Sequence, residues 1–138
     1  EKHIDYVERF HNTPFKIKNK LDAISHATCG MAIDIKAKAM VISSRSGITV
    51  RMVSRFRAPM DIIGMATDKK VWYKLALSWG VTPVMSEHFD STDVLFYHAA
   101  KTAKTLLGLQ KGDGIVATAG NVGGETGNTD TIRMITIQ

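Results

Sequence analysis

A polar loop at residues 43–49, SSRSGIT, concentrates residue types that bind small anions. It lies between a β-branched run and a helical pattern, so we expect a strand-to-helix turn there. Unpaired backbone N–H groups at a helix N-terminus stabilise a phosphate, provided that no protein group already occupies them. The alternative is that a serine of the loop only caps the helix. The candidate phosphate-binding residues are Ser44, Arg45, Ser46, Gly47 and Thr49.

A second loop, GNVGGETGN at residues 120–128, is rich in glycine. It either wraps a ligand or is a flexible hairpin connection. Its one charged residue, Glu125, repels a phosphate and suits a sugar hydroxyl or a cation from another subunit better. The candidate ligand-contacting residues of this loop are Gly120, Gly123, Gly124, Glu125, Thr126 and Gly127.

Other chemistry finds little support in the sequence. Cys29 is the only cysteine, and its apolar neighbours predict a buried, inert thiol in a reducing cytosol. The five histidines lack metal-ligand spacing, so no metal site is predicted. The chain has neither a Walker A ending nor a GxGxxG fingerprint. We therefore expect no catalytic residues.

The charge pattern also excludes classes of partner. The formal net charge is +5, but the basic residues are dispersed and few aromatic residues stand among them to stack on bases. We therefore predict a binder of small anions and not of nucleic acid. No apolar run reaches the length of about 18 residues that a membrane span needs, so a cytoplasmic protein without membrane association is expected.

Short β-branched runs alternate with helical patterns, which is typical of a parallel sheet covered on both faces. The final β-prone run, 131–138, follows too few residues for a crossover helix, so it should return antiparallel. The fold class is therefore α/β. The four strands expected before it are Ala39 to Ser43, Asp61 to Thr67, Val81 to Met85 and Gly114 to Ala119.

Helices are predicted from apolar periodicity and capping residues. Asp22 is the expected cap of the first helix, Asp68 of the third, and Ser91 or Thr92 of the last. Residues 10–20 show no clear period and should form a linker or an extended arm. The predicted helices run from Asp22 to Ile35, from Gly47 to Arg57, from Lys69 to Trp79 and from Asp93 to Leu107.

Several segments, taken in order, resemble the C-terminal domain of pyruvate kinase. They are DAISHATCGMAIDIKAKAMV, SGITVRMVSRFRAP, LALSWGVTPV, LQKGDGIVATAG and GETGNTDTIRMITI, and the likeness runs from about Leu21 to the end of the chain. The GETG form is similar to bacterial members. The resemblance implies a three-layer α/β/α domain whose mostly parallel five-stranded sheet has an antiparallel last strand.

The resemblance also implies a function. In this family the domain binds an allosteric effector, such as fructose 1,6-bisphosphate, AMP or a sugar monophosphate, and takes part in assembling a tetramer. The loop matching 44–49 cradles the phosphate and the loop matching 120–127 closes over the sugar. Residues 1–20 would then be an arm leading from a barrel domain, and residues 21–138 the effector domain.

Catalysis is expected to need parts that this sequence lacks. The family transfers a phosphoryl group from phosphoenolpyruvate to ADP at a barrel that binds magnesium and potassium, and none of the barrel motifs occurs in these residues. We therefore expect no cofactor and no turnover from this chain alone. Two alternatives are an assembly module that binds no effector and a free-standing protein of the same fold.

Overall fold

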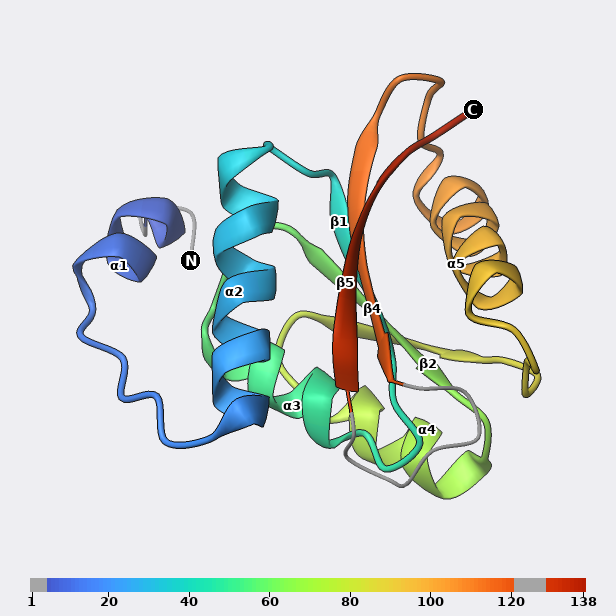
Figure 1. The fold of residues 1–138 in the computed structure, drawn as a ribbon, viewed down its shortest axis with the longest axis horizontal. Helices are drawn as coiled ribbons and strands as arrows, with labels where there is room; N and C mark the ends of the chain where they lie inside the picture. Colours follow the sequence, from blue (N-terminus) through green and yellow to red (C-terminus); the bar gives the residue numbers. More distant parts are fainter. Residues whose placement is uncertain (1–4, 121–128) are drawn as a thin grey trace.

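The β-branched runs form a five-stranded sheet with helices on both faces (Figure 1). The structure is a computed structural model that describes residues 5–120 and 129–138. The elements in chain order are α1 Tyr6–Asn12, α2 Lys20–Asp34, β1 Ala39–Ser43, α3 Ile48–Arg55, β2 Asp61–Ala66, α4 Lys69–Ala76, β3 Val81–Met85, α5 Thr92–Leu107, β4 Gly114–Gly120 and β5 Thr129–Thr136.

The strand order is β3-β2-β1-β4-β5. The pairs β1/β2, β1/β4 and β2/β3 are parallel, and β4/β5 is antiparallel. This confirms the predicted sheet and its returning last strand. The register pairs Ser43 with Met65 and Ile42 with Thr118, so the turn after β1 lies at the edge where the parallel strands end.

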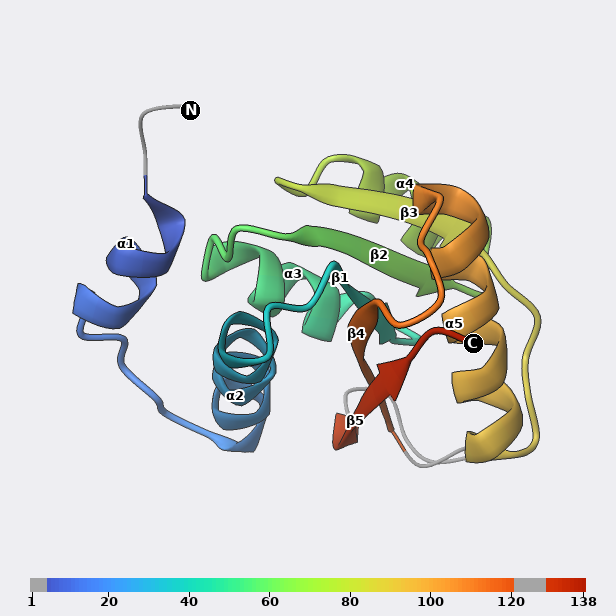
Figure 2. The same cartoon turned by 90° about the horizontal axis from the view of Figure 1, so that it is seen from above.

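Figure 2 shows α2 and α3 on one side of the sheet and α5 on the other. The two faces bury different clusters of side chains. On one face α2, α3 and α4 pack over alternate residues of β1, β2 and β4, among them Met40, Ile42 and Ile62. On the other face α5 packs over the intervening residues through Leu95, Phe96 and two alanines. The period-two alternation of strand side chains therefore divides the core into two layers.

The helix caps agree with the sequence in part. The Asp68 carboxylate accepts a hydrogen bond from the amide of Val71 at 2.9 Å, which confirms this cap of α4. The cap of α2 is Asn19, because its side chain accepts from the amide of Asp22 at 2.8 Å. Asp22 was wrongly predicted as the cap: it lies in the first turn, where its carboxylate accepts from the Lys18 amide.

Two other helix ends differ from the predictions. Helix α3 ends at Arg55 and α4 at Ala76, short of the predicted Arg57 and Trp79. Helix α3 stops because Arg57 adopts a positive φ of 54°, which a continuing helix does not allow. At the start of α5, Ser91 is the N-cap, although its side chain makes no capping hydrogen bond.

The N-terminal arm, which we define as residues 5–18, contains a short helix that the sequence did not predict. Helix α1 is capped by Asp5, whose carboxylate accepts from the Glu8 amide at 3.0 Å. Phe10 is its one buried side chain. The segment that follows, 13–18, has no helix or strand and matches the expected extended arm. A seven-residue helix with one buried residue leaves too little apolar periodicity to detect.

Candidate anion-binding site

The turn between β1 and α3 brings the predicted phosphate-binding residues together at the carboxyl edge of the sheet. Residues 44–47 form the turn, and Thr49 lies in the first turn of α3. No acidic residue occurs in this first turn. The partial positive charge of the helix N-terminus is therefore not neutralised by a neighbouring carboxylate on α3.

Two backbone amides of the turn already have side-chain acceptors. The amide of Gly47 donates to Ser44 Oγ at 3.1 Å, and the amide of Ile48 donates to Ser46 Oγ at 3.3 Å. The N-cap residue of α3 is Gly47, which has no side-chain cap, so these two serine bonds hold the turn that leads into the helix. Because a hydroxyl accepts and also donates, rotation of each serine side chain would release the amide and offer an O–H to a phosphate.

The geometry of the turn requires a glycine at position 47. Its φ of 81° lies in the left-handed region, and a Cβ built there would come within 3.1 Å of Leu75 Cδ2 and 3.2 Å of Val71 Cγ1. The glycine therefore serves both the turn and the close contact between the turn and α4. This fixes the start of α3 against its neighbour.

The candidate side chains differ in exposure. Arg45 is exposed and Ser46 is half-buried, so these two side chains are accessible to a ligand from solvent. Ser44 and Thr49 are buried, with 8% and 1% of their surface exposed. Ile48 is 41% exposed and adds an apolar side chain to the rim of the turn. A ligand would first meet Arg45, Ser46 and the backbone.

Most of the second candidate loop lies outside the described residues. Gly120 ends β4, where it pairs with Thr129 beside a register shift. The remaining predicted contacts of that loop, Gly123, Gly124, Glu125, Thr126 and Gly127, fall within the undescribed segment. Their proposed role over the ligand therefore stays a prediction.

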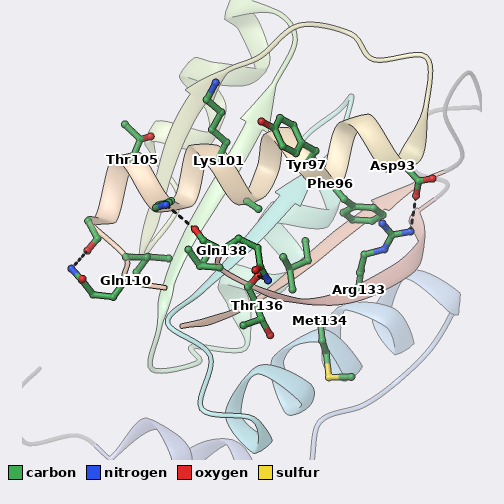
Figure 3. A pocket seen from close by; sticks show the side chains of 16 residues that line it. Asp93, Phe96, Tyr97, Lys101, Thr105, Gln110, Arg133, Met134, Thr136 and Gln138 are labelled. Carbon is green, nitrogen blue, oxygen red and sulfur yellow. Dashed lines mark hydrogen bonds and ion pairs between the residues drawn. The ribbon is translucent and has the colours of Figure 1, made fainter. Parts of the chain in front are cut away.

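A groove that the sequence did not predict runs between α5 and β5, with a volume of about 1070 Å³ (Figure 3). Tyr97 and Lys101 of α5 line one side, and residues 133–138 line the other. Phe96 lies at its base and is 1% exposed. The sequence contained one signal for this groove, the β-prone terminal run. A strand at the edge of a sheet has one side that no neighbouring strand covers, so a groove can form there.

Two basic side chains of the groove connect β5 and the residues after it to α5. The Arg133 guanidinium lies 3.1 Å from the Asp93 carboxylate and 4.5 Å from the centre of the Phe96 ring. Lys104 Nζ donates to the backbone carbonyl of Gln138 at 2.8 Å (Figure 3). These contacts fasten β5 to α5 and leave the groove with a net positive lining.

The described residues offer little for nucleophilic or metal chemistry. Cys29 is fully buried, and burial raises the pKa of its thiol from 9.0 to about 12, so the thiolate is disfavoured. Across 5–120 and 129–138, no three histidine, cysteine or acidic side chains gather closely enough to hold a metal ion. None of the helices in these ranges is long and apolar enough to cross a membrane.

Comparison with known proteins agrees with the motifs. The family model described as "Pyruvate kinase, alpha/beta domain" matches residues 22–135. A pyruvate kinase of Clostridium acetobutylicum is 36% identical over 121 residues, which are 88% of this chain and 26% of the relative. A pyruvate kinase of Lactobacillus delbrueckii subsp. bulgaricus is 30% identical over 128 residues, 93% of this chain and 21% of the relative.

A solved structure supports the fold independently. A pyruvate kinase from Cryptosporidium parvum superposes with a TM-score of 0.84 at 22% identity, over 99% of this chain and 27% of that chain. The chain thus spans about a quarter of the length of the proteins it matches. Since the family model and the bacterial relatives align over most of the chain, it belongs to the pyruvate kinase family as the C-terminal alpha/beta domain.

Proposed function

We propose that this chain is the regulatory, effector-binding domain of a pyruvate kinase and takes part in its assembly. The observation that carries the proposal is the turn after β1, where α3 begins without a nearby acid on its first turn and Arg45 stands exposed. A sugar phosphate or AMP would place its phosphate at this helix N-terminus. The glycine-rich loop that includes Gly120 would then contact the sugar.

Phosphoryl transfer would belong to a longer protein. The relatives are about four times as long as the matched part, and we propose that a barrel in the complete enzyme supplies the magnesium and potassium sites. The domain itself would have no catalytic residue and no cofactor. The complete enzyme would work in the cytoplasm as a homo-oligomer, with a tetramer as the family expectation.

Effector binding is tested by calorimetric titration of the chain with fructose 1,6-bisphosphate, AMP and glucose 6-phosphate. We expect heat from at least one of them, and Arg45→Ala should weaken that binding by about tenfold because a charge-assisted contact to phosphate is lost. Arg55→Ala is the matched control: it also removes one positive charge, but from the last turn of α3 and not from the turn that precedes the helix. Absence of heat with all three compounds, for a folded chain, would remove the effector role.

An assembly module without effector binding is the second candidate. It is favoured by the serine hydroxyls that already satisfy the Gly47 and Ile48 amides, and by the free edge of β5, where Met134 is 59% exposed. Light scattering on the wild type and Arg45→Ala separates the two functions. The regulatory function predicts unchanged assembly and weaker ligand binding, whereas a pure assembly module has no ligand binding to weaken.

A further inference from the structure

The C-terminal end of α3 is held in an unusual conformation. Arg57 has a φ of 54°, and Lys36 is the only other non-glycine residue with a positive φ in the described part of the chain. Such a backbone persists only where surrounding contacts hold it. Here the Arg57 guanidinium lies 4.4 Å from the centre of the Trp79 ring, and Ser54 Oγ donates to the Trp79 carbonyl at 2.5 Å.

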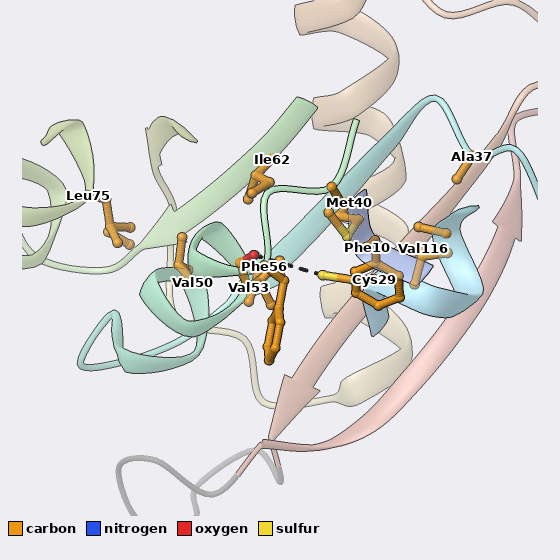
Figure 4. Close-up of a cluster of buried hydrophobic side chains, with 14 of the residues drawn as sticks. Phe10, Cys29, Ala37, Met40, Val50, Val53, Phe56, Ile62, Leu75 and Val116 are labelled. Carbon is orange, nitrogen blue, oxygen red and sulfur yellow. Dashed lines mark hydrogen bonds between the residues drawn. The ribbon is translucent and has the colours of Figure 1, made fainter. Parts of the chain in front are cut away.

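The same end of α3 carries Phe56, which packs into a cluster of rings. The Phe56 ring centre lies 4.8 Å from that of Phe15 and 5.4 Å from that of His26. Phe10 stacks on His26 at 4.7 Å, and its ring centre lies 6.4 Å from that of Phe56. Figure 4 shows Phe56 and Phe10 in the buried cluster that also contains Cys29. Phe10 and Phe15 belong to the N-terminal arm, so the arm docks on α3 through these rings.

The arm makes a second contact beside the first. The Tyr6 ring centre lies 5.4 Å from that of Trp79, whose ring also carries the Arg57 guanidinium. The arm therefore touches the end of α3 directly at Phe56 and indirectly through Trp79. Phe10 is the one buried residue of α1, so its ring contacts and that of Tyr6 fasten this helix to the domain.

We call the rings of Phe10, Phe15, His26 and Phe56 the aromatic seam. Helix α3 connects this seam to the candidate anion site. It has eight residues and is about 12 Å long, and its N-terminus forms the turn that begins at Ser44. Val50 and Val53 are fully buried, and Gly47 is pressed against α4. A helix this short and this well packed shifts as one body, so a force on either end reaches the other.

We propose that docking of the N-terminal arm and binding of a phosphate at the start of α3 are thermodynamically coupled through α3. This rests on the proposed effector function. The docked arm holds α3 where its first amides meet the ligand, and by reciprocity the bound ligand strengthens docking of the arm. In a longer pyruvate kinase the arm would join this domain to the part that precedes it, so the coupling would carry the effector signal toward the rest of the enzyme.

The test compares two half-buried phenylalanines that each pack on a histidine. Phe15→Ala removes a ring of the seam, whereas Phe89→Ala removes a ring that stacks on His98 at 4.6 Å on the α5 face of the sheet. Fructose 1,6-bisphosphate and AMP are titrated calorimetrically into the wild-type chain and both variants. We expect Phe15→Ala to raise the Kd by about fivefold or more and Phe89→Ala to leave it within about twofold.

A second variant and a second readout protect the test against a folding defect. Tyr6→Ala removes a half-buried ring that contacts Trp79, and it should also weaken binding. Hydrogen exchange of the amides of α1 should slow when ligand is added to the wild type, because binding strengthens docking. Circular dichroism confirms that each variant is folded before titration.

The outcomes are distinguishable. Ligand binding that Phe15→Ala and Tyr6→Ala leave unchanged, with no ligand effect on exchange in α1, overturns the coupling and leaves the effector site standing. Absence of binding in the wild type overturns the effector function and the coupling together. Weaker binding in both arm variants but not in Phe89→Ala supports the coupling.

Discussion

The two faces of the sheet are covered differently. Helices α2, α3 and α4 lie side by side over one face, and their contacts are close: a Cβ built on Gly64 would lie only 2.8 Å from Leu75 Cδ1. Among the described residues, α5 is the one helix over the opposite face, and a groove of about 1070 Å³ remains along β5. The same sheet therefore has a tightly packed face and an open one.

The two polar surfaces of the domain, the turn after β1 and the groove beside β5, lie on these two different faces. The turn at Ser44 to Thr49 belongs to the three-helix face, where packing fixes the backbone and the serine hydroxyls are already engaged. The groove belongs to the α5 face, where Arg133 and Lys104 fasten exposed segments together. Recognition of a phosphate by backbone amides requires fixed geometry, so it is expected on the packed face.

The thiol of Cys29 gives the largest expected contrast. Because it is fully buried on the inner side of α2, alkylation by iodoacetamide at pH 8 should be at least about a thousandfold slower in the folded chain than in urea. Mass spectrometry of timed samples measures the rate. A rate within about tenfold of that of the unfolded chain would show that the three-helix face opens easily, and it would break the comparison.

The same thiol predicts a pH dependence of stability. Its pKa is 9.0 when exposed and about 12 when buried, so the unfolded chain loses the proton first as the pH rises. The thiol contribution is therefore complete below pH 9 and is lost between pH 9 and about 12. Urea unfolding of wild type and Cys29→Ala over this range should show a steeper decline for the wild type.

Gly47→Ala sharpens the comparison by matching it to a glycine on the open face. Gly47 and Gly108 both have positive φ, but a Cβ at Gly47 meets Leu75 within 3.1 Å, whereas one at Gly108 meets nothing within 4 Å. We expect losses in the free energy of unfolding of about 2–3 kcal/mol for Gly47→Ala and about 1 kcal/mol for Gly108→Ala. Equal losses in urea titrations would contradict close packing at the turn.

Arg133→Ala should have the smallest effect. The Arg133 side chain is 43% exposed and its partner Asp93 is 85% exposed, so solvent screens the ion pair. We expect a loss of about 0.5–1 kcal/mol, part of it from the contact with Phe96, and a smaller loss in 1 M salt. Lys101→Ala, on the same groove, serves as the neutral control. A loss above about 2 kcal/mol would mean that the open face is also well packed.

The sequence predicts most of the sheet, for reasons that are local. The runs 39–43 and 81–85 are short, β-branched and bounded by polar or turn residues, and the structure has β1 and β3 at the same bounds. Asp68 caps α4 as expected because its side chain precedes an amphipathic pattern. These elements depend on neighbouring residues alone, which a single sequence displays.

What the sequence missed depends on contacts between distant segments. The cap at Asn19 follows an irregular segment, and α1 is stabilised by rings of α2 and α3 that lie far along the chain. The groove exists only because α5 leaves part of β5 uncovered. At the turn the predicted residues lie together, but the sequence did not decide whether the serines engage the amides or leave them available.

The most direct test of the central claim follows the backbone amides of the turn. In nitrogen-15 correlation spectra, addition of fructose 1,6-bisphosphate or AMP should shift the resonances of Gly47 and Ile48 more than that of Gly108, since these amides would exchange their serine acceptors for phosphate oxygens. Saturable binding with the Gly47 and Ile48 resonances unmoved would contradict an anion site at the start of α3.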